Sequence, residues 1–167
     1  MFDKTLHDER DKATKDCVIK LYNQESKHLK VEENADQYGI DLIVKNKHGL
    51  PIHYVECEST YAWNGPDYPY SSVILYERKK HFLYNMDACS HPNCHKNHPY
   101  SCKKLIHGPM PIYFFVVNKH YNQALIYTAN IAIASPGQII QTDRGPEFVR
   151  LIPLDKCTHV KLKSSAS

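Results

Sequence analysis

Two apolar segments separated by a short polar turn bring three acidic side chains into one small region of the chain. The first segment is Gly39–Val44, which contains Asp41, and the second is Ile52–Glu58, which contains Glu56 and Glu58. Two apolar runs joined by turn-forming residues are typical of an antiparallel β-hairpin. Because side chains alternate across a strand, Glu56 and Glu58 should project from one face and their neighbours from the other. We therefore expect the carboxylates to share a site.

Clustered carboxylates of this kind favour a bound cation. Like charges a few ångströms apart repel, and burying them without a partner is unfavourable. A cluster of carboxylates is therefore usually accompanied by a bound cation. Hard oxygen ligands prefer Mg²⁺ or Mn²⁺, and these ions can orient a phosphodiester and activate the attacking water. The alternative is that the acidic residues line a solvated strand face.

The spacing of these acidic residues resembles that of the PD-(D/E)XK nuclease superfamily, in which Asp on one strand is followed by Glu-x-Lys on the next. Asp41 matches the first acid and Glu56 the second, while Glu58 stands where lysine is usual. This departure resembles a Glu-x-Glu variant of some restriction enzymes. The resemblance covers residues 35–83 and rests on a short motif. It implies an α/β fold, with a restriction-endonuclease-like mixed β-sheet flanked by helices.

The segment Tyr76–Leu83 offers a substitute for the missing lysine. It contains Lys79 and Lys80 and is expected to begin a helix. Some members of the superfamily carry the catalytic lysine on the neighbouring helix, so the resemblance implies that Lys79, or else Lys80, polarises the water or neutralises charge on the phosphate. Glu77 could add a fourth carboxylate. The alternative is a solvated helix face that carries a few charges.

Residues 59–70 contain the only Trp and three of the twelve Tyr residues. The stretch is rich in turn formers and is expected to be a loop. Its aromatic side chains could stack on bases beside a metal site, or they could fold back and seal the core. The sequence leaves both interpretations open.

A second cluster, in residues 89–102, predicts a zinc site. It holds three of the six Cys and three of the eleven His residues. The spacing Cys-x4-Cys-x3-His-x3-Cys supplies four ligands of the type that structural zinc prefers, and metal ligation would order a loop with little apolar content. The predicted ligands, in an insertion at about 87–104, are Cys89, Cys94, His98 and Cys102. His91 or His95 could replace His98, and the competing interpretations are a disulfide, a solvated loop and a ββα-metal site.

The chain as a whole is expected to form a single domain over residues 1–167. It is 42% hydrophobic and 23% charged, which is typical of a globular protein. No stretch of eighteen apolar residues and no signal pattern is found, so we expect a soluble, intracellular protein with no membrane contact. The net charge of +3 indicates no strong basic field, although local basic groups could bind phosphate. The three cysteines outside the cluster are expected to be buried thiols: Cys17, Cys57 and Cys157.

Other segments complete the expected fold. Residues 5–24 show the apolar periodicity of an amphipathic helix, from which Glu9 or Glu25 could reach the site. The apolar runs 111–117 and 124–129 are expected to be strands paired through a turn, and residues 131–134 a short helix or loop. Residues 148–154, followed by 157–162, are expected to form a last edge strand and its approach.

Together these features predict a metal-dependent DNA endonuclease, with DNA as partner and a homodimer if both strands are cut. Asp41 and Glu56 would hold Mg²⁺ or Mn²⁺, Glu58 would act as ligand or base, and Lys79 would assist. The alternatives are a non-catalytic zinc-containing module that binds nucleic acid or protein, and a nuclease of the same fold directed at RNA.

Overall fold

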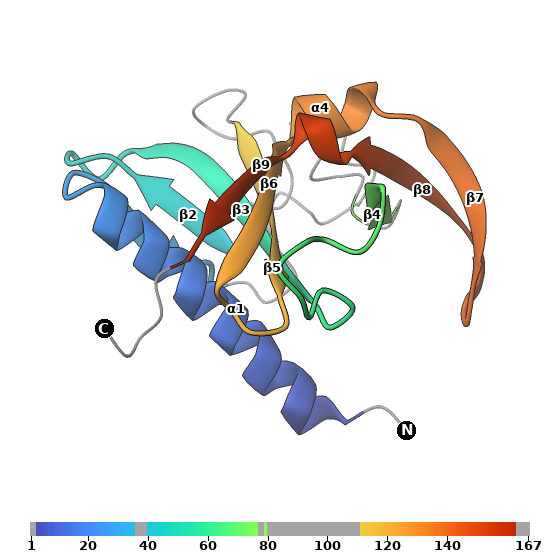
Figure 1. Cartoon of the computed structure of the whole chain (residues 1–167). Helices are drawn as coiled ribbons and strands as arrows, with labels where there is room; N and C mark the ends of the chain where they lie inside the picture. The colour runs from blue at the N-terminus through green and yellow to red at the C-terminus, as the bar shows by residue number, and fades with distance from the viewer. Residues whose placement is uncertain (1–2, 36–39, 77–78, 80–110, 163–167) are drawn as a thin grey trace.

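The computed structural model describes residues 3–35, 40–76, 79 and 111–162, which form two β-sheets and two α-helices (Figure 1). One sheet has six strands in the order β1-β2-β3-β5-β6-β9, and the other has three in the order β4-β8-β7. The elements are α1 (Lys4–Glu25), β1 (Lys30–Glu33), β2 (Leu42–Lys45), β3 (Pro51–Thr60), β4 (Ser72–Tyr76), β5 (Ile112–Asn118), β6 (Gln123–Thr128), α4 (Ala129–Ala134), β7 (Gly137–Thr142), β8 (Gly145–Pro153), a 3-10 turn (Leu154–Lys156) and β9 (Thr158–Lys161).

The predicted first helix is confirmed. α1 begins after Asp3, whose carboxylate accepts a hydrogen bond from the amide of Leu6 and satisfies one of the free N–H groups of the first turn. Val18 of α1 is fully buried against the six-stranded sheet. The helix therefore covers one face of this sheet, as its apolar periodicity requires.

The predicted hairpin is also confirmed. β2 and β3 pair antiparallel, with Leu42 opposite Val55. In the turn, the side chain of Asn46 accepts hydrogen bonds from the amides of two later residues, and Gly49 adopts a positive φ of 77°. Asp41 lies directly before β2 rather than within it, so its side chain is at the start of the hairpin's first strand.

The central strand pair of the large sheet is parallel. β3 pairs with β5 so that Glu56 lies opposite Phe114, and β5 continues into an antiparallel pair with β6. Apolar side chains on one face of these strands pack with α1, and those on the other face pack with α4 and the second sheet. The expectation of an α/β architecture with a mixed sheet is therefore confirmed.

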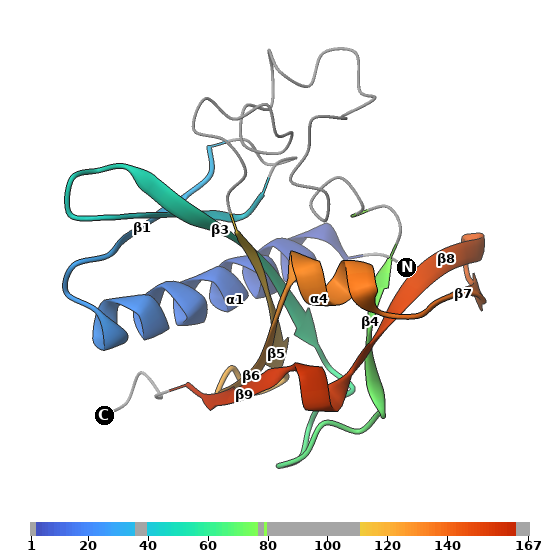
Figure 2. The same cartoon turned by 90° about the horizontal axis from the view of Figure 1, so that it is seen from above.

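Three strands were not predicted from the sequence: β1, β4 and β7. Tyr76, expected to begin a helix, is the last residue of β4, and the rest of that segment except Lys79 lies outside the described residues. Of the two segments expected to give a last edge strand and its approach, residues 157–162 contain β9, which is an edge strand of the large sheet. Residues 148–154 belong mainly to β8, which is the central strand of the small sheet and not an approach to that edge. Figure 2 shows β7 and β8 extending away from the large sheet.

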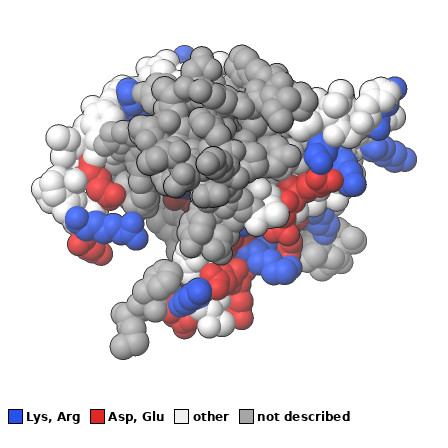
Figure 3. Space-filling model, turned by 180° about the vertical axis from the view of Figure 1, so that it is seen from behind, with Lys and Arg blue, Asp and Glu red and all other residues white. Residues whose placement is uncertain are grey.

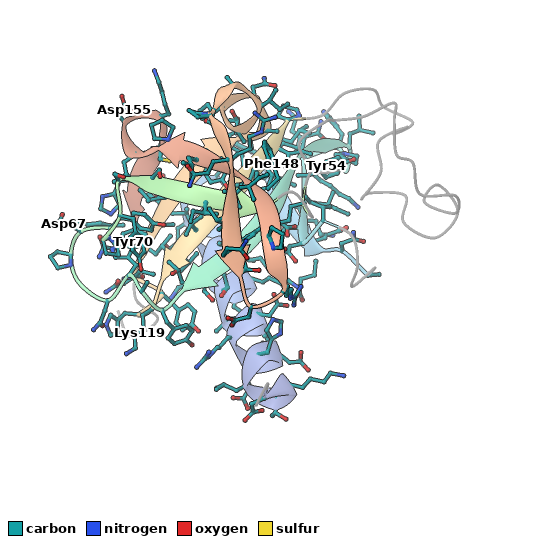
Figure 4. All side chains as sticks on the ribbon, turned by 90° about the vertical axis from the view of Figure 1, so that its right-hand side faces the viewer. Tyr54, Asp67, Tyr70, Lys119, Phe148 and Asp155 are labelled. Carbon is teal, nitrogen blue, oxygen red and sulfur yellow. The ribbon has the colours of Figure 1, made fainter. Side chains whose placement is uncertain are left out.

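The expected loop after β3 is confirmed over residues 61–70, and its aromatic residues divide between core and surface. Trp63 is fully buried in the cluster that joins the two sheets, where it contacts Tyr68 edge to face. Tyr70 of the same loop, labelled in Figure 4, is 57% exposed. The expectation that the aromatic side chains of this loop fold back onto the core is therefore correct for Trp63.

The thiol prediction is partly correct. Cys57 is buried, whereas Cys17 and Cys157 are half-buried, and all three are free.

None of the helices in the described ranges is long and apolar enough to cross a membrane.

The packing of Trp63 gives a stability prediction. We expect Trp63→Ala to lower the free energy of unfolding by about 3–5 kcal/mol, because it removes a large, fully buried side chain from the junction of the two sheets. Urea unfolding followed by far-UV circular dichroism measures the change. The control is Tyr70→Ala in the same loop, for which about 0.5 kcal/mol or less is expected because Tyr70 is exposed. Equal losses in the two variants would contradict the assignment of Trp63 to the core.

Candidate active site

A cavity of about 410 Å³ lies between the first half of α1, the second half of β3 and Lys79. It brings together all four residues that the sequence nominated for catalysis. Its lining consists of His7, Arg10, Asp11 and Thr14 from α1, together with Asp41, Glu56, Cys57, Glu58, Ser59, Tyr61 and Lys79.

The position of the cavity follows from the lengths of the paired strands. β2 begins at Leu42, opposite Val55, so within the described residues β3 has no strand partner on that side after Val55. Four consecutive residues of β3, from 56 to 59, therefore line the cavity along this unpaired part of the strand. The amide of Cys57 donates a 2.8 Å hydrogen bond to Oδ2 of Asp41, which holds this carboxylate against the strand.

Glu56 is the most deeply buried acidic side chain of the site, with only 7% of the residue exposed. Its Oε1 accepts a 2.9 Å hydrogen bond from Nζ of Lys79. Its other oxygen, Oε2, is buried and has no hydrogen-bond partner among the described residues. Burial, followed by the negative charge of Asp41, raises the pKa of Glu56 to about 8. A buried carboxyl oxygen without a partner needs a proton or a cation.

Asp41 faces Glu56 across the start of the hairpin. Nζ of Lys15 lies 3.4 Å from Oδ1 of Asp41 and 2.8 Å from Oδ2 of Asp11, so the lysine bridges the two acids. Burial raises the pKa of Asp41, and the hydrogen bond from Cys57 and the charge of Lys15 act in the opposite direction. The two carboxylates of Asp41 and Glu56 are thus held close together by separate positive partners.

Glu58 and Lys79 occupy the more open side of the cavity. The side chain of Glu58 is 42% exposed, and its Oε2 lies 3.9 Å from Nζ of Lys79. Burial alone would lower the pKa of Lys79, but the charges of Glu56 and Glu58 raise it above the ordinary value. Lys79 is therefore a cation shared by two glutamates.

The sequence indicated that α1 could reach the site, but not through the residues that line the cavity. The four lining residues of the helix recur at intervals of three and one, which places them on a single face. Their spacing is a usable signal, but the sequence cannot distinguish a polar face that meets a cavity from one that meets water. The two glutamates proposed from this region, Glu9 and Glu25, do not line the cavity.

The residues present fit a hard divalent ion only with help from other ligands. In the part of the chain that the structure describes, no three His, Cys, Asp or Glu side chains are arranged so as to hold a metal by themselves. Asp41 and Glu56 offer two carboxylates, including the unpartnered Oε2. Mg²⁺ is commonly bound by one or two carboxylates with water and substrate phosphate completing its shell, so this donor set fits it. The predicted zinc ligands Cys89, Cys94, His98 and Cys102 lie outside the described residues.

Acidic and basic side chains are mixed around the site and do not form a basic surface. The lining contains the carboxylates of Asp11, Asp41, Glu56 and Glu58 but only two residues with a permanent positive charge, Arg10 and Lys79. Figure 3 likewise shows Lys and Arg interspersed with Asp and Glu on the face seen from behind. Lys15 adds a third cation through its contacts with Asp11 and Asp41, so the positive and negative groups nearly balance, and the cavity offers no strong attraction to a polyanion.

Comparison of the chain with family models, curated proteins and solved structures gave no match. Membership of the PD-(D/E)XK superfamily therefore stays a prediction, and the site is interpreted through its own geometry.

The raised pKa of Glu56 predicts a pH-dependent stability in the presence of a chelator. A carboxyl group with a raised pKa binds its proton more tightly in the folded state, so its stabilising effect is present below the ordinary pKa of 4.5 and is lost as the pH rises to about 8. We expect the stability of the wild type to fall over this range relative to Glu56→Gln. Urea midpoints at several pH values measure the difference, with Glu58→Gln as the control for removing one carboxylate from β3. Parallel curves for the wild type and Glu56→Gln would contradict the prediction.

Proposed function

We propose that this protein is a Mg²⁺- or Mn²⁺-dependent DNA endonuclease of the PD-(D/E)XK type, in its Glu-x-Glu form. One observation carries the proposal: Asp41, directly before β2, and Glu56, within the neighbouring β3, meet at a cavity where one buried carboxyl oxygen has no hydrogen-bond partner among the described residues. The placement of Asp41 before β2 and of Glu56 within β3 supports the match to the motif.

The balance of charge supports a cation requirement. Four carboxylates line the cavity, and the cations beside them are Arg10, Lys79 and Lys15, so one negative charge is in excess when all four acids are ionised. A divalent cation between Asp41 and Glu56 would offset the excess negative charge and allow a phosphodiester to approach. The ion would also replace the proton that a buried Glu56 otherwise retains.

When bound, Mg²⁺ or Mn²⁺ lowers the pKa of the attacking water and stabilises negative charge on the phosphate. Glu58, which is partly exposed and next to the site, accepts the proton that the water loses. Lys79 donates to the phosphate oxygens as charge develops on them. The oxygen of water forms a bond to phosphorus and the bond from phosphorus to the 3′ oxygen breaks. The leaving 3′ oxygen takes a proton from solvent water, so the products are a 5′ phosphate and a 3′ hydroxyl.

The site of one chain can cut one strand of a duplex. Cleavage of both strands would then require a homodimer, whereas a monomer would nick. An intracellular location forms part of the proposal, because zinc thiolates persist in a reducing compartment.

Cleavage of a supercoiled plasmid tests the proposal. With Mn²⁺, we expect the wild type to relax or linearise the plasmid, and Asp41→Asn and Glu56→Gln to be slower by at least about a hundredfold, because each removes a charged ligand. Lys79→Ala should be slower by about 10² to 10³, as for the loss of one group that stabilises charge in the transition state. The rates are read by gel electrophoresis.

The matched controls are Asp16→Asn and Glu147→Gln, which remove carboxylates that do not line the cavity. They should cut as the wild type does. Single-stranded RNA is included in the same assay to test the RNA-directed alternative. Binding of DNA without cleavage, alike in the wild type and all variants, would overturn the nuclease proposal.

A non-catalytic binding module is the second candidate. The observation that favours it is the 2.9 Å contact between Lys79 and Glu56, which partly neutralises the acidic pair without a metal. In that case the site would be a structural ion pair and Mn²⁺ would have no effect on stability. A rise in the unfolding temperature with Mn²⁺ in the wild type, lost in Asp41→Asn, would favour the nuclease.

Structural zinc in the 87–104 segment remains part of the proposal. We expect elemental analysis of the purified protein to find about one zinc per chain, and Cys94→Ser or Cys102→Ser to lower this content. Cys17→Ser is the control, because this half-buried free thiol lies in α1. Absence of zinc, with freely reactive thiols in the folded protein, would contradict the proposal of a structural zinc site.

A further inference from the structure

Arg10 is a cation of the cavity that no described carboxylate neutralises. Lys15 is paired with Asp11 and Asp41, and Lys79 is paired with Glu56 and Glu58. Arg10 lines the same cavity, and its Nε is buried without a hydrogen-bond acceptor among the described residues. A buried donor without a partner is unfavourable, so this guanidinium is suited to an acceptor that arrives from outside.

The guanidinium of Arg10 is already held in place. Its central carbon lies 3.8 Å from the centroid of the Tyr61 ring, a cation–π contact between α1 and the loop after β3. Because the guanidinium is already stacked on a ring from another segment of the chain, less conformational entropy is lost when a ligand binds to it.

The chemistry of this group selects a phosphate. A guanidinium presents five N–H donors in a planar fork that matches two oxygens of a phosphate, and an arginine stacked on an aromatic ring keeps this fork oriented. A nucleic-acid strand carries phosphates at regular intervals. A nucleic-acid strand whose scissile phosphate lies beside Asp41 and Glu56 would therefore bring the next phosphate to the part of the cavity that Arg10 lines.

We propose that Arg10 is a phosphate-binding residue, whose guanidinium donates to the non-bridging oxygens of a phosphodiester next to the one that is cut. Tyr61 is a positioning residue that orients this guanidinium. The inference rests on the proposed function, because it takes the bound strand to be nucleic acid. It adds α1 to the substrate-binding surface.

The test is the affinity for a fluorescent DNA duplex, measured by anisotropy at a series of KCl concentrations with Ca²⁺ as the divalent ion. The integrity of the duplex is checked by gel after each measurement. For Arg10→Gln we expect a Kd about tenfold higher than that of the wild type and a slope of log Kd against log salt that is smaller by about one. The matched control is Arg144→Gln, an exposed arginine in the turn between β7 and β8, which should change neither quantity.

Two further variants separate charge from geometry. Arg10→Lys keeps the positive charge and loses the fork, so it should retain the salt slope and raise the Kd severalfold. Tyr61→Leu removes the ring that holds the guanidinium, and it should raise the Kd less than Arg10→Gln does. Far-UV circular dichroism and urea midpoints of each variant establish that the fold is kept. Should Arg10→Gln fail to fold, Arg10→Lys and Tyr61→Leu carry the test.

The outcomes separate this inference from the nuclease proposal. If the wild type binds and Arg10→Gln shows the same Kd and slope, or if the wild type does not bind, the inference is overturned, and plasmid cleavage decides the nuclease proposal independently. If binding depends on Arg10 but the wild type does not cut, the phosphate contact stands and the nuclease proposal fails. A change of equal size in Arg144→Gln would also overturn the inference, because it would reflect total charge alone.

Discussion

The burial of Glu56 beside Asp41 is the interaction on which the rest of the site depends. Two carboxylates in a low-dielectric region repel each other, and such an arrangement persists only if positive groups compensate it. Lys79 compensates Glu56, and Lys15 compensates Asp41 from the helix that crosses the sheet. The packing of α1 and the course of the chain after β4 are thereby linked to the charge of the same two acids. One oxygen of Glu56 still lacks a hydrogen-bond partner among the described residues, and the proposal of a bound cation is based on this unpaired oxygen.

The sequence predicted the parts of the fold whose patterns are strong and local. The amphipathic period of α1, the hairpin around Asn46 and the apolar runs of β5 and β6 all correspond to described elements. It did not predict β7, where Ile139 is 70% exposed and the adjacent Ile139 and Ile140 are flanked by Gln residues with no apolar alternation. Such a strand is stabilised by pairing with β8 and not by an apolar face, so its pattern carries little signal. The assignment of Tyr76 to a helix failed for a related reason, because pairing with Val149 places it in a strand.

The candidate site could be predicted only as far as neighbouring strands define it. The closeness of Asp41 and Glu56 follows from the pairing of Leu42 with Val55, because each acid is the next residue along the chain from that pair, although a bulge at Val44 and Lys45 shifts the register nearer the turn. The approach of Lys79 depends on how the chain returns after β4, which no local pattern specifies. Arg10, Asp11 and Thr14 belong to a helix face whose polar residues resemble those of any solvated helix. Whether such a face meets water or a cavity is decided by tertiary packing, which periodicity does not encode.

The parallel pairing of β3 with β5 has a consequence for how the molecule is made. Residues 54 to 60 align with residues 112 to 118, so the strand that carries Glu56 gains its inner neighbour only after a long stretch of chain has been synthesised and looped back. Closing such a loop costs conformational entropy before stabilising contacts between the two strands can form. Non-local strand pairing of this kind therefore slows folding. The β2–β3 hairpin can form early, whereas the low-dielectric surroundings of the acids assemble late. During biosynthesis these acids would therefore stay hydrated, and their mutual repulsion would arise only in the final steps of folding.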